Sequence, residues 1–74
     1  MTKSKNNLLS VAIAKKIKSL RQKNSVTQEV FYFDTGIHLG RIEQGKSNIT
    51  LNTLDIICNY FEIPLKEFFS DLDY

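Results

Sequence analysis

Residues 27–45 read Thr-Gln-Glu-Val-Phe-Tyr-Phe-Asp-Thr-Gly-Ile-His-Leu-Gly-Arg-Ile-Glu-Gln-Gly. Thr27 is a good N-cap for a helix that continues to about Phe33, and Glu29 adds favourable charge to its first turn. The turn residues at 34–36 then interrupt the helical pattern, and a second helix is expected from Ile37 to about Gln44. Gly45 can end that helix in the left-handed backbone conformation. The stretch therefore predicts two short helices joined by a tight turn.

The rest of the chain carries the hydrophobic spacing of three further helices. Apolar residues at intervals of three and four mark one helical face before the stretch and two after it. The first of these helices begins at Ser10 or Asn7, the next is capped by Asn52 or Thr50, and Pro64 suits the first turn of the last. The three apolar faces are Leu9, Ile13, Ile17 and Leu20; Leu51, Leu54, Ile57, Cys58 and Phe61; and Leu65, Phe68, Phe69 and Leu72. The pattern predicts an all-α fold of five helices without a sheet.

The size of the chain allows one domain at most. Its 74 residues, of which 42% are hydrophobic, lie near the lower limit for folding without disulfides or metals. We expect a flexible tail over residues 1–6 and a single domain over residues 7–74.

Four large side chains crowd the C-terminus, more than so small a domain should bury, and they predict a homodimer interface. They are Phe68, Phe69, Leu72 and Tyr74.

Basic and acidic residues are unevenly distributed along the chain. Residues 1–24 hold seven Lys or Arg and no acidic residue, whereas residues 25–74 hold three basic and eight acidic residues, a net charge of 3 − 8 = −5. This asymmetry suggests one surface that meets phosphates and another that does not. A solvated, lysine-rich helix face explains the first segment equally well.

Several classes of protein are excluded by composition. No apolar run is long enough to span a membrane, and the N-terminal segment does not read as a secretory signal, so we expect a cytoplasmic protein. The single cysteine, Cys58, cannot form an intramolecular disulfide and is expected to be a buried thiol. One histidine and one cysteine cannot make a metal site alone, and with His38 as the only candidate base the sequence offers no arguable Ser-His-acid set. The sequence therefore predicts a protein that is not an enzyme and needs no cofactor.

One motif points to nucleotide chemistry. Residues 40–47, Gly-Arg-Ile-Glu-Gln-Gly-Lys-Ser, match the phosphate-binding pattern G-x-x-x-x-G-K-[ST] in full. That motif works only between a buried strand and a helix in an α/β domain. Here Leu39 and Ile42 have helical spacing and no β-α-β pattern surrounds them, so we reject this reading.

The stretch at 27–45 resembles the helix-turn-helix of the phage-repressor (Cro/repressor-like) family. The resemblance rests on Gln28 directly after the capping Thr27, on the turn glycine Gly36, and on the Arg-Ile-Glu-x-Gly run at 41–45. It extends from about Ala14 to Phe69. Members of this family lay the second helix of the motif in the DNA major groove.

The resemblance implies a sequence-specific transcriptional regulator of double-stranded DNA, such as a repressor or a controller protein. It implies a homodimer on a palindromic operator, with no small-molecule ligand. Two alternatives stay open. One is an antitoxin or another protein-interaction module that uses the C-terminal aromatic surface, and the other is a fold that no longer reads DNA.

Candidate DNA-contacting residues follow from the pattern and from the resemblance. A helix in the major groove needs an apolar face against its own domain, here Leu39 and Ile42, and an outward polar face, here His38 and Arg41. Gly40 would let the backbone approach the DNA closely. The family likeness implies a phosphate contact for the glutamine at 28 and backbone contacts for the loop after Gly45. The full set is Thr27, Gln28, Thr35, His38, Arg41, Lys46, Ser47 and Asn48.

Two further expectations come from the family likeness. Glu43 matches the family's structural glutamate, whose usual partner is the arginine ending the first helix, so an Arg21–Glu43 ion pair is expected. The chain also departs from the family, because the spacing from Gln28 to Glu43 is a few residues shorter than usual. In addition, Tyr32 or Phe31 stands where a small alanine is common. The shortening trims the turn or the start of the second motif helix and leaves the exact base-contacting positions open.

Overall fold

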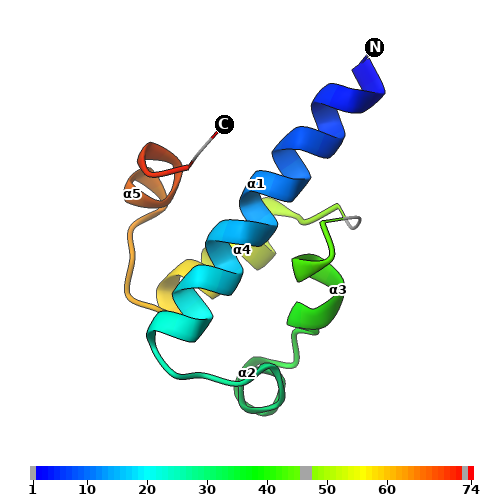
Figure 1. The fold of residues 1–74 in the computed structure, drawn as a ribbon. Helices are drawn as coiled ribbons and strands as arrows, with labels where there is room; N and C mark the ends of the chain where they lie inside the picture. Colours follow the sequence, from blue (N-terminus) through cyan, green and yellow to red (C-terminus); the bar gives the residue numbers. More distant parts are fainter. Residues whose placement is uncertain (1, 46–47, 73) are drawn as a thin grey trace.

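A computed structural model describes residues 2–45, 48–72 and 74, with side chains from Leu8 onward, and in these residues it contains five α-helices and no strand (Figure 1). The helices are α1 (Thr2–Lys23), α2 (Gln28–Thr35), α3 (Leu39–Glu43), α4 (Leu51–Tyr60) and α5 (Leu65–Ser70). The long α1 runs through the middle of the molecule, and α3 and α5 lie on opposite sides of it (Figure 1). The all-α, five-helix fold predicted from the sequence is confirmed.

The helix ends show where local signals act. Thr27 caps α2 as predicted, because its hydroxyl accepts a hydrogen bond from the Val30 N–H at 3.1 Å. Of the two candidates for the cap of α4, the structure uses Thr50, which accepts from the Thr53 N–H at 3.0 Å. Gly45 follows α3 with a φ of 74°, the left-handed conformation expected for it. α1 begins at Thr2, earlier than Asn7 or Ser10, so the helix includes residues 2–6, and the flexibility of a tail there stays a prediction.

The turn between α2 and α3 lies later in the chain than the sequence predicts. α2 continues to Thr35, whose hydroxyl donates to the Phe31 carbonyl at 2.8 Å. Gly36 then takes a φ of 78°, and its N–H donates to the Tyr32 carbonyl at 2.7 Å. α3 begins at Leu39, after the N-cap residue His38. The turn is therefore made after Thr35, because the left-handed residue that reverses the chain is Gly36 itself.

Every helix contributes a fully buried side chain to one core. The seven largest are Ile17 from α1, Phe31 from α2, Leu39 from α3, Leu54, Ile57 and Cys58 from α4, and Phe68 from α5. Burial, and secondarily the charge of Asp55, raise the pKa of the Cys58 thiol, so this cysteine is a small apolar core residue, as expected. Leu39 anchors the short α3, and the Phe31 ring packs against Tyr60 and Phe61 with centroid distances of 4.6 and 5.7 Å. These contacts fix α2 and α3 to the domain.

The predicted C-terminal interface needs one correction. Phe68 is 0% exposed in the single chain, so it has no surface left for a partner subunit. Its neighbour Phe69 is 44% exposed and Tyr74 is 64% exposed, while Leu72 is partly buried against the core. The reason is that α5 is short and its inward face is centred on Phe68, so the two adjacent phenylalanines point to opposite environments.

The hydrogen bond between Tyr60 on α4 and Asp34 on α2 should make the free energy of unfolding fall as the pH rises into the alkaline range. The Tyr60 hydroxyl donates to Asp34 Oδ2 at 2.6 Å, and this bond, then burial and the Asp34 charge, raise the pKa of Tyr60. A pKa that is higher in the folded state adds stability below the unfolded value of about 10, and this stability is lost as the pH rises through the folded value. We expect Tyr60→Phe to be less stable than the wild type at pH 8 and the difference to shrink above about pH 10. Urea unfolding of both proteins across this range measures it, and a constant difference would contradict the account.

Candidate nucleic-acid interface

α2 and α3 form the two walls of an open pocket of about 440 Å³. Gln28, Glu29 and Tyr32 come from α2, and His38, Leu39, Gly40, Arg41 and Gln44 come from α3 and its ends. Three of the residues predicted to contact DNA, namely Gln28, His38 and Arg41, are thus brought together. His38 and Arg41 are exposed, whereas Leu39 is fully buried and Ile42 is partly buried against the core. The predicted burial of Leu39 and Ile42 and the predicted exposure of His38 and Arg41 are confirmed, although His38 is the N-cap before α3 and not part of the helix.

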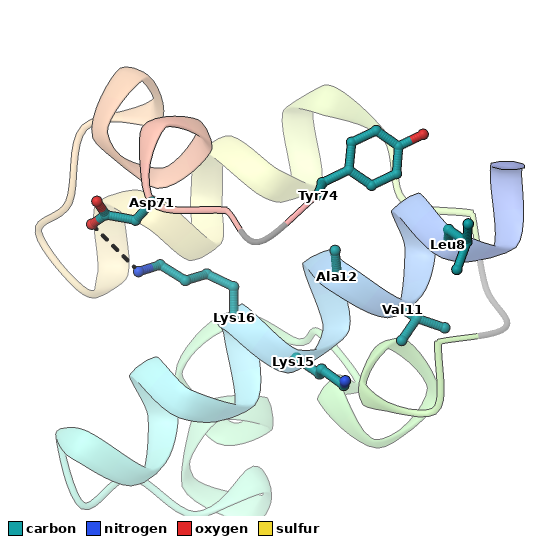
Figure 2. Close-up of a pocket in the computed structure, with 7 residues that line it drawn as sticks. All are labelled: Leu8, Val11, Ala12, Lys15, Lys16, Asp71 and Tyr74. Carbon is teal, nitrogen blue, oxygen red and sulfur yellow. Dashed lines mark ion pairs between the residues drawn. The ribbon is translucent and has the colours of Figure 1, made fainter.

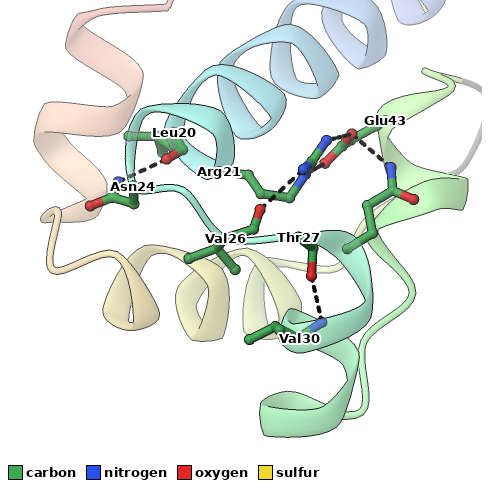
Figure 3. A network of polar contacts seen from close by, with 8 residues as sticks. Leu20, Arg21, Asn24, Val26, Thr27, Val30 and Glu43 are labelled. Carbon is green, nitrogen blue, oxygen red and sulfur yellow. Dashed lines mark hydrogen bonds and ion pairs between the residues drawn. The ribbon is translucent and has the colours of Figure 1, made fainter.

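An ion pair between Arg21 near the end of α1 and Glu43 at the end of α3 connects these two helices (Figure 3). Arg21 Nε and a terminal guanidinium nitrogen donate to the two carboxylate oxygens of Glu43, at 2.7 and 3.0 Å. A third Arg21 nitrogen donates to the Val26 carbonyl at 3.1 Å, in the connection before α2. The side chains of Arg21 and Glu43 are only 13% and 5% exposed. The ion pair expected from the sequence is present, and it also holds the entry to α2.

Charge and hydrogen bonding act together at this pair. The hydrogen bond with Glu43 raises the pKa of Arg21, partial burial opposes the rise, and the negative charge of Glu43 adds to it. A two-pronged contact between a planar guanidinium and a carboxylate fixes the relative orientation of the two groups. The Arg21–Glu43 pair therefore sets the position of α3 relative to α1.

Gln28 takes part in the same network. Its side-chain N–H donates to Glu43 Oε1 at 3.0 Å, so the amide nitrogen of this exposed residue already has a partner within the chain. Its amide oxygen would lie 3.3 Å from a Cβ added at Gly40. Gly40 therefore leaves room for the side chain of Gln28, and the close approach of DNA to the Gly40 backbone stays a prediction. A phosphate contact by Gln28 stays a prediction.

The remaining candidates lie at the margin of the pocket or beyond it. The Thr27 hydroxyl caps α2, and the Thr35 hydroxyl both donates to Phe31 and accepts from the Ile37 N–H at 3.1 Å, so both serve the local backbone. Asn48 is exposed. Lys46 and Ser47 lie outside the described residues.

Sequence reasoning missed the part played by Tyr32. Its ring stacks on that of His38, with centroids 4.3 Å apart and planes at 28°. Tyr32 is one helical turn after Gln28, and this spacing placed it on the same face of α2, which was the available signal. The sequence could not show that the trimmed turn brings His38 back over this ring.

Residues 40–45 of the rejected phosphate-loop motif form the end of a helix, and the other two residues of the motif lie outside the described part of the chain. Residues 40–43 belong to α3, Gln44 is its C-cap, and Gly45 follows in the left-handed conformation. Between residues 2 and 45 the described chain contains helices and turns and no strand that could precede such a loop. The match at 40–47 therefore reflects the composition of a helix terminus.

The described residues also lack two further kinds of feature, a metal-binding cluster and a membrane-spanning helix. Among the described side chains, no group of three or more His, Cys, Asp and Glu residues is placed to hold a metal ion. Within the same part of the chain, no helix combines the length and the apolar character needed to cross a membrane.

Comparison with known proteins identifies the family. A profile of the helix-turn-helix family of the Cro/C1 type matches residues 17–68, from the second half of α1 into α5. Searches of curated proteins and of solved structures gave no match. The matched family is one of DNA-binding regulators and is not typically enzymatic. Since the match includes the α2–α3 pair and most of the chain, this protein belongs to the Cro/C1-type helix-turn-helix family of DNA-binding transcriptional regulators.

Proposed function

We propose that this chain represses or controls transcription by binding a palindromic operator as a homodimer, with α3 in the major groove. The observation that carries the proposal is the outward pair His38 and Arg41 on a short helix whose opposite face is anchored by the fully buried Leu39. A helix placed in this way offers polar side chains to base edges while its backbone stays fixed to the domain. The buried Arg21–Glu43 pair supports the proposal, because it holds that helix rigidly.

The proposed contacts divide into two kinds. Arg41 and His38 are proposed to contact bases, because they stand on the outward face of α3. The others are proposed to contact the backbone, which positions the protein without reading sequence. They are Thr27, Gln28, Thr35, Lys46, Ser47 and Asn48. A regulator of this kind acts on DNA in the cytoplasm and requires no cofactor.

The proposed homodimer uses the apolar surface near the C-terminus. Phe69 and Tyr74 are exposed, and Leu72 is half-buried beside them in sequence. Tyr74 also lines an apolar hollow of about 610 Å³ with Leu8, Val11 and Ala12 of α1, and the Lys16–Asp71 ion pair of 3.6 Å lies at one end (Figure 2). α5 lies on the other side of α1 from α3 (Figure 1), so a partner bound to α5 would leave both α3 helices facing DNA. A two-fold dimer presents its recognition helices about 34 Å apart, which sets the half-site spacing.

Replacing Arg41 with alanine tests the proposed reading of bases. We expect Arg41→Ala to weaken binding to the preferred operator by about 1–3 kcal/mol and to relax preference at one position of each half-site. Lys46→Ala should weaken specific and random duplexes alike, because a phosphate contact carries no sequence information. Lys66→Ala, which removes an exposed positive charge from α5, is the control for net charge and should change little. Fluorescence anisotropy on matched duplexes measures all three, and equal losses of Arg41→Ala on specific and random DNA would reduce Arg41 to a phosphate contact.

A protein-interaction module is the second candidate function, and the exposure of Phe69 and Tyr74 favours it. The two functions differ in the state of the chain alone. Analytical ultracentrifugation should show a dimer that Phe69→Ala weakens if the surface joins two copies. A monomer at every accessible concentration, with no sequence preference in DNA binding, would support the second candidate.

A further inference from the structure

The stacked pair Tyr32 and His38 is the part of the α2–α3 surface that the family motif does not explain. Tyr32 is 48% exposed, and it lies on α2, whose inward residue is the fully buried Phe31. Its ring faces that of His38 at 4.3 Å, with the planes 28° apart. The exposed ring of Tyr32 is therefore placed to orient the side chain of His38, which is predicted to contact a base.

The backbone brings the two rings together. Gly36 adopts the left-handed conformation, and its N–H donates to the carbonyl of Tyr32 itself at 2.7 Å. The chain then reverses within two residues and enters α3 at Leu39, so that His38 returns to the end of α2 that carries Tyr32. The turn through Gly36 therefore brings the two rings into contact.

His38 lacks the side-chain hydrogen bond that the N-cap residues of α2 and α4 make. Thr27 and Thr50 each accept a hydrogen bond from a backbone N–H of the helix that they begin. His38 is the N-cap of α3 and makes no side-chain cap hydrogen bond. Its side chain is exposed, so packing in the core does not fix it either. Among the described residues, the ring of Tyr32 is the contact that restricts the imidazole.

Both rings lie in the surface proposed to meet DNA. They line the α2–α3 pocket together with Arg41 and Gln44, which follow His38 at intervals of three residues on α3. A side chain that is ordered before binding loses less conformational entropy when it makes its hydrogen bond, and its donors keep one direction. Stacking at this point would thus sharpen what His38 recognises.

We propose that Tyr32 is a positioning residue for DNA specificity, and that its ring holds the imidazole of His38 in the orientation that reads one base pair of each half-site. The inference rests on the proposed function, because it assigns a role within the same interface. Tyr32 acts through His38, and its hydroxyl makes no essential contact with DNA.

A double-mutant cycle on the selected operator tests this role. Tyr32→Ala and His38→Ala should each lower affinity for the operator about two- to tenfold, and both should relax preference at the same base pair. The double variant should be no worse than His38→Ala alone, because Tyr32 has nothing left to orient. Tyr32→Phe keeps the ring and should behave as the wild type. Affinities are measured on the operator, on each of its single-base-pair variants and on a random duplex, with thermal unfolding of every variant by circular dichroism.

Each other outcome contradicts the proposal in a distinct way. A loss in Tyr32→Phe as large as in Tyr32→Ala would show a direct hydroxyl contact. Additive losses in the double variant, or equal losses of Tyr32→Ala on all duplexes, would show independent contacts or a general structural effect. A wild type without any sequence preference would contradict the proposed function itself. A wild type with preference, whose specificity Tyr32→Ala leaves unchanged, would contradict the role of Tyr32 alone.

Discussion

Replacing Phe68 with alanine is expected to remove most of the stability of this domain. Phe68 is 0% exposed and belongs to the one core that all five helices share. Truncating a buried phenylalanine costs about 3–5 kcal/mol, from lost burial and from the cavity that remains. A domain of this size has a total stability on the order of 5 kcal/mol, so the variant should retain at most about 2 kcal/mol and unfold at much lower urea concentrations than the wild type. Urea unfolding followed by circular dichroism measures the loss.

The adjacent residue supplies the matched control. Phe69 is 44% exposed, and its ring meets that of Phe68 edge-on with centroids 5.6 Å apart. Phe69→Ala should therefore cost less than half as much in the free energy of unfolding, when both are measured at concentrations where the chain is monomeric. The same variant should weaken the proposed dimer, as sedimentation would show. Equal losses of stability in the two variants would contradict the assignment of Phe68 to the core and Phe69 to the surface.

The second large effect is expected at the ion pair that holds α3. Glu43→Ala leaves the guanidinium of Arg21, which is 13% exposed, without its carboxylate, and it removes the acceptor of Gln28. Removing one partner of a buried pair costs about 3–5 kcal/mol, because the remaining charge is desolvated and unpaired. We expect a loss of about 3 kcal/mol in the free energy of unfolding and a fall in affinity for specific DNA among the molecules that stay folded. Chemical unfolding and DNA titration of the same samples measure the two effects.

The chain contains a surface ion pair that serves as the control for Glu43. Lys16 Nζ and Asp71 Oδ2 are 3.6 Å apart, and the Asp71 side chain is 54% exposed. Asp71→Ala should cost less than about 1 kcal/mol, since water already solvates and screens this pair. Equally small losses in the free energy of unfolding for Glu43→Ala and Asp71→Ala would show that the Arg21–Glu43 pair does not hold α3 in place.

The features that the sequence predicts well are those that local chemistry determines. Thr27 caps its helix through its own hydroxyl, and Gly45 supplies a left-handed residue after α3, so both are visible without a structure. Helical spacing likewise predicts that Leu39 lies on the inward face of α3, where it is fully buried. The Arg21–Glu43 pair is different, because 22 residues separate its members, and the family resemblance alone suggested it.

The features that the sequence missed depend on contacts between helices. Phe68 and Phe69 share one apolar pattern, and the packing of the six-residue α5 alone determines which of them is buried. At the candidate site, the outward positions of His38 and Arg41 followed from helical spacing. The stacking of Tyr32 on His38 did not, because it depends on the path of the turn through Gly36. The use of Gly40 to accommodate Gln28 also arises only when α2 and α3 come together.

Selection of DNA by the wild-type chain tests most directly whether α2 and α3 form a surface that recognises a DNA sequence. A random duplex pool should be passed over the wild-type chain at near-physiological salt, and the retained molecules sequenced. We expect enrichment of an inverted repeat whose half-sites lie about one helical turn apart, and relaxed preference at one position of each half-site in Arg41→Ala. Retention without enrichment that disappears as salt rises would show binding to phosphates alone and would contradict the claim.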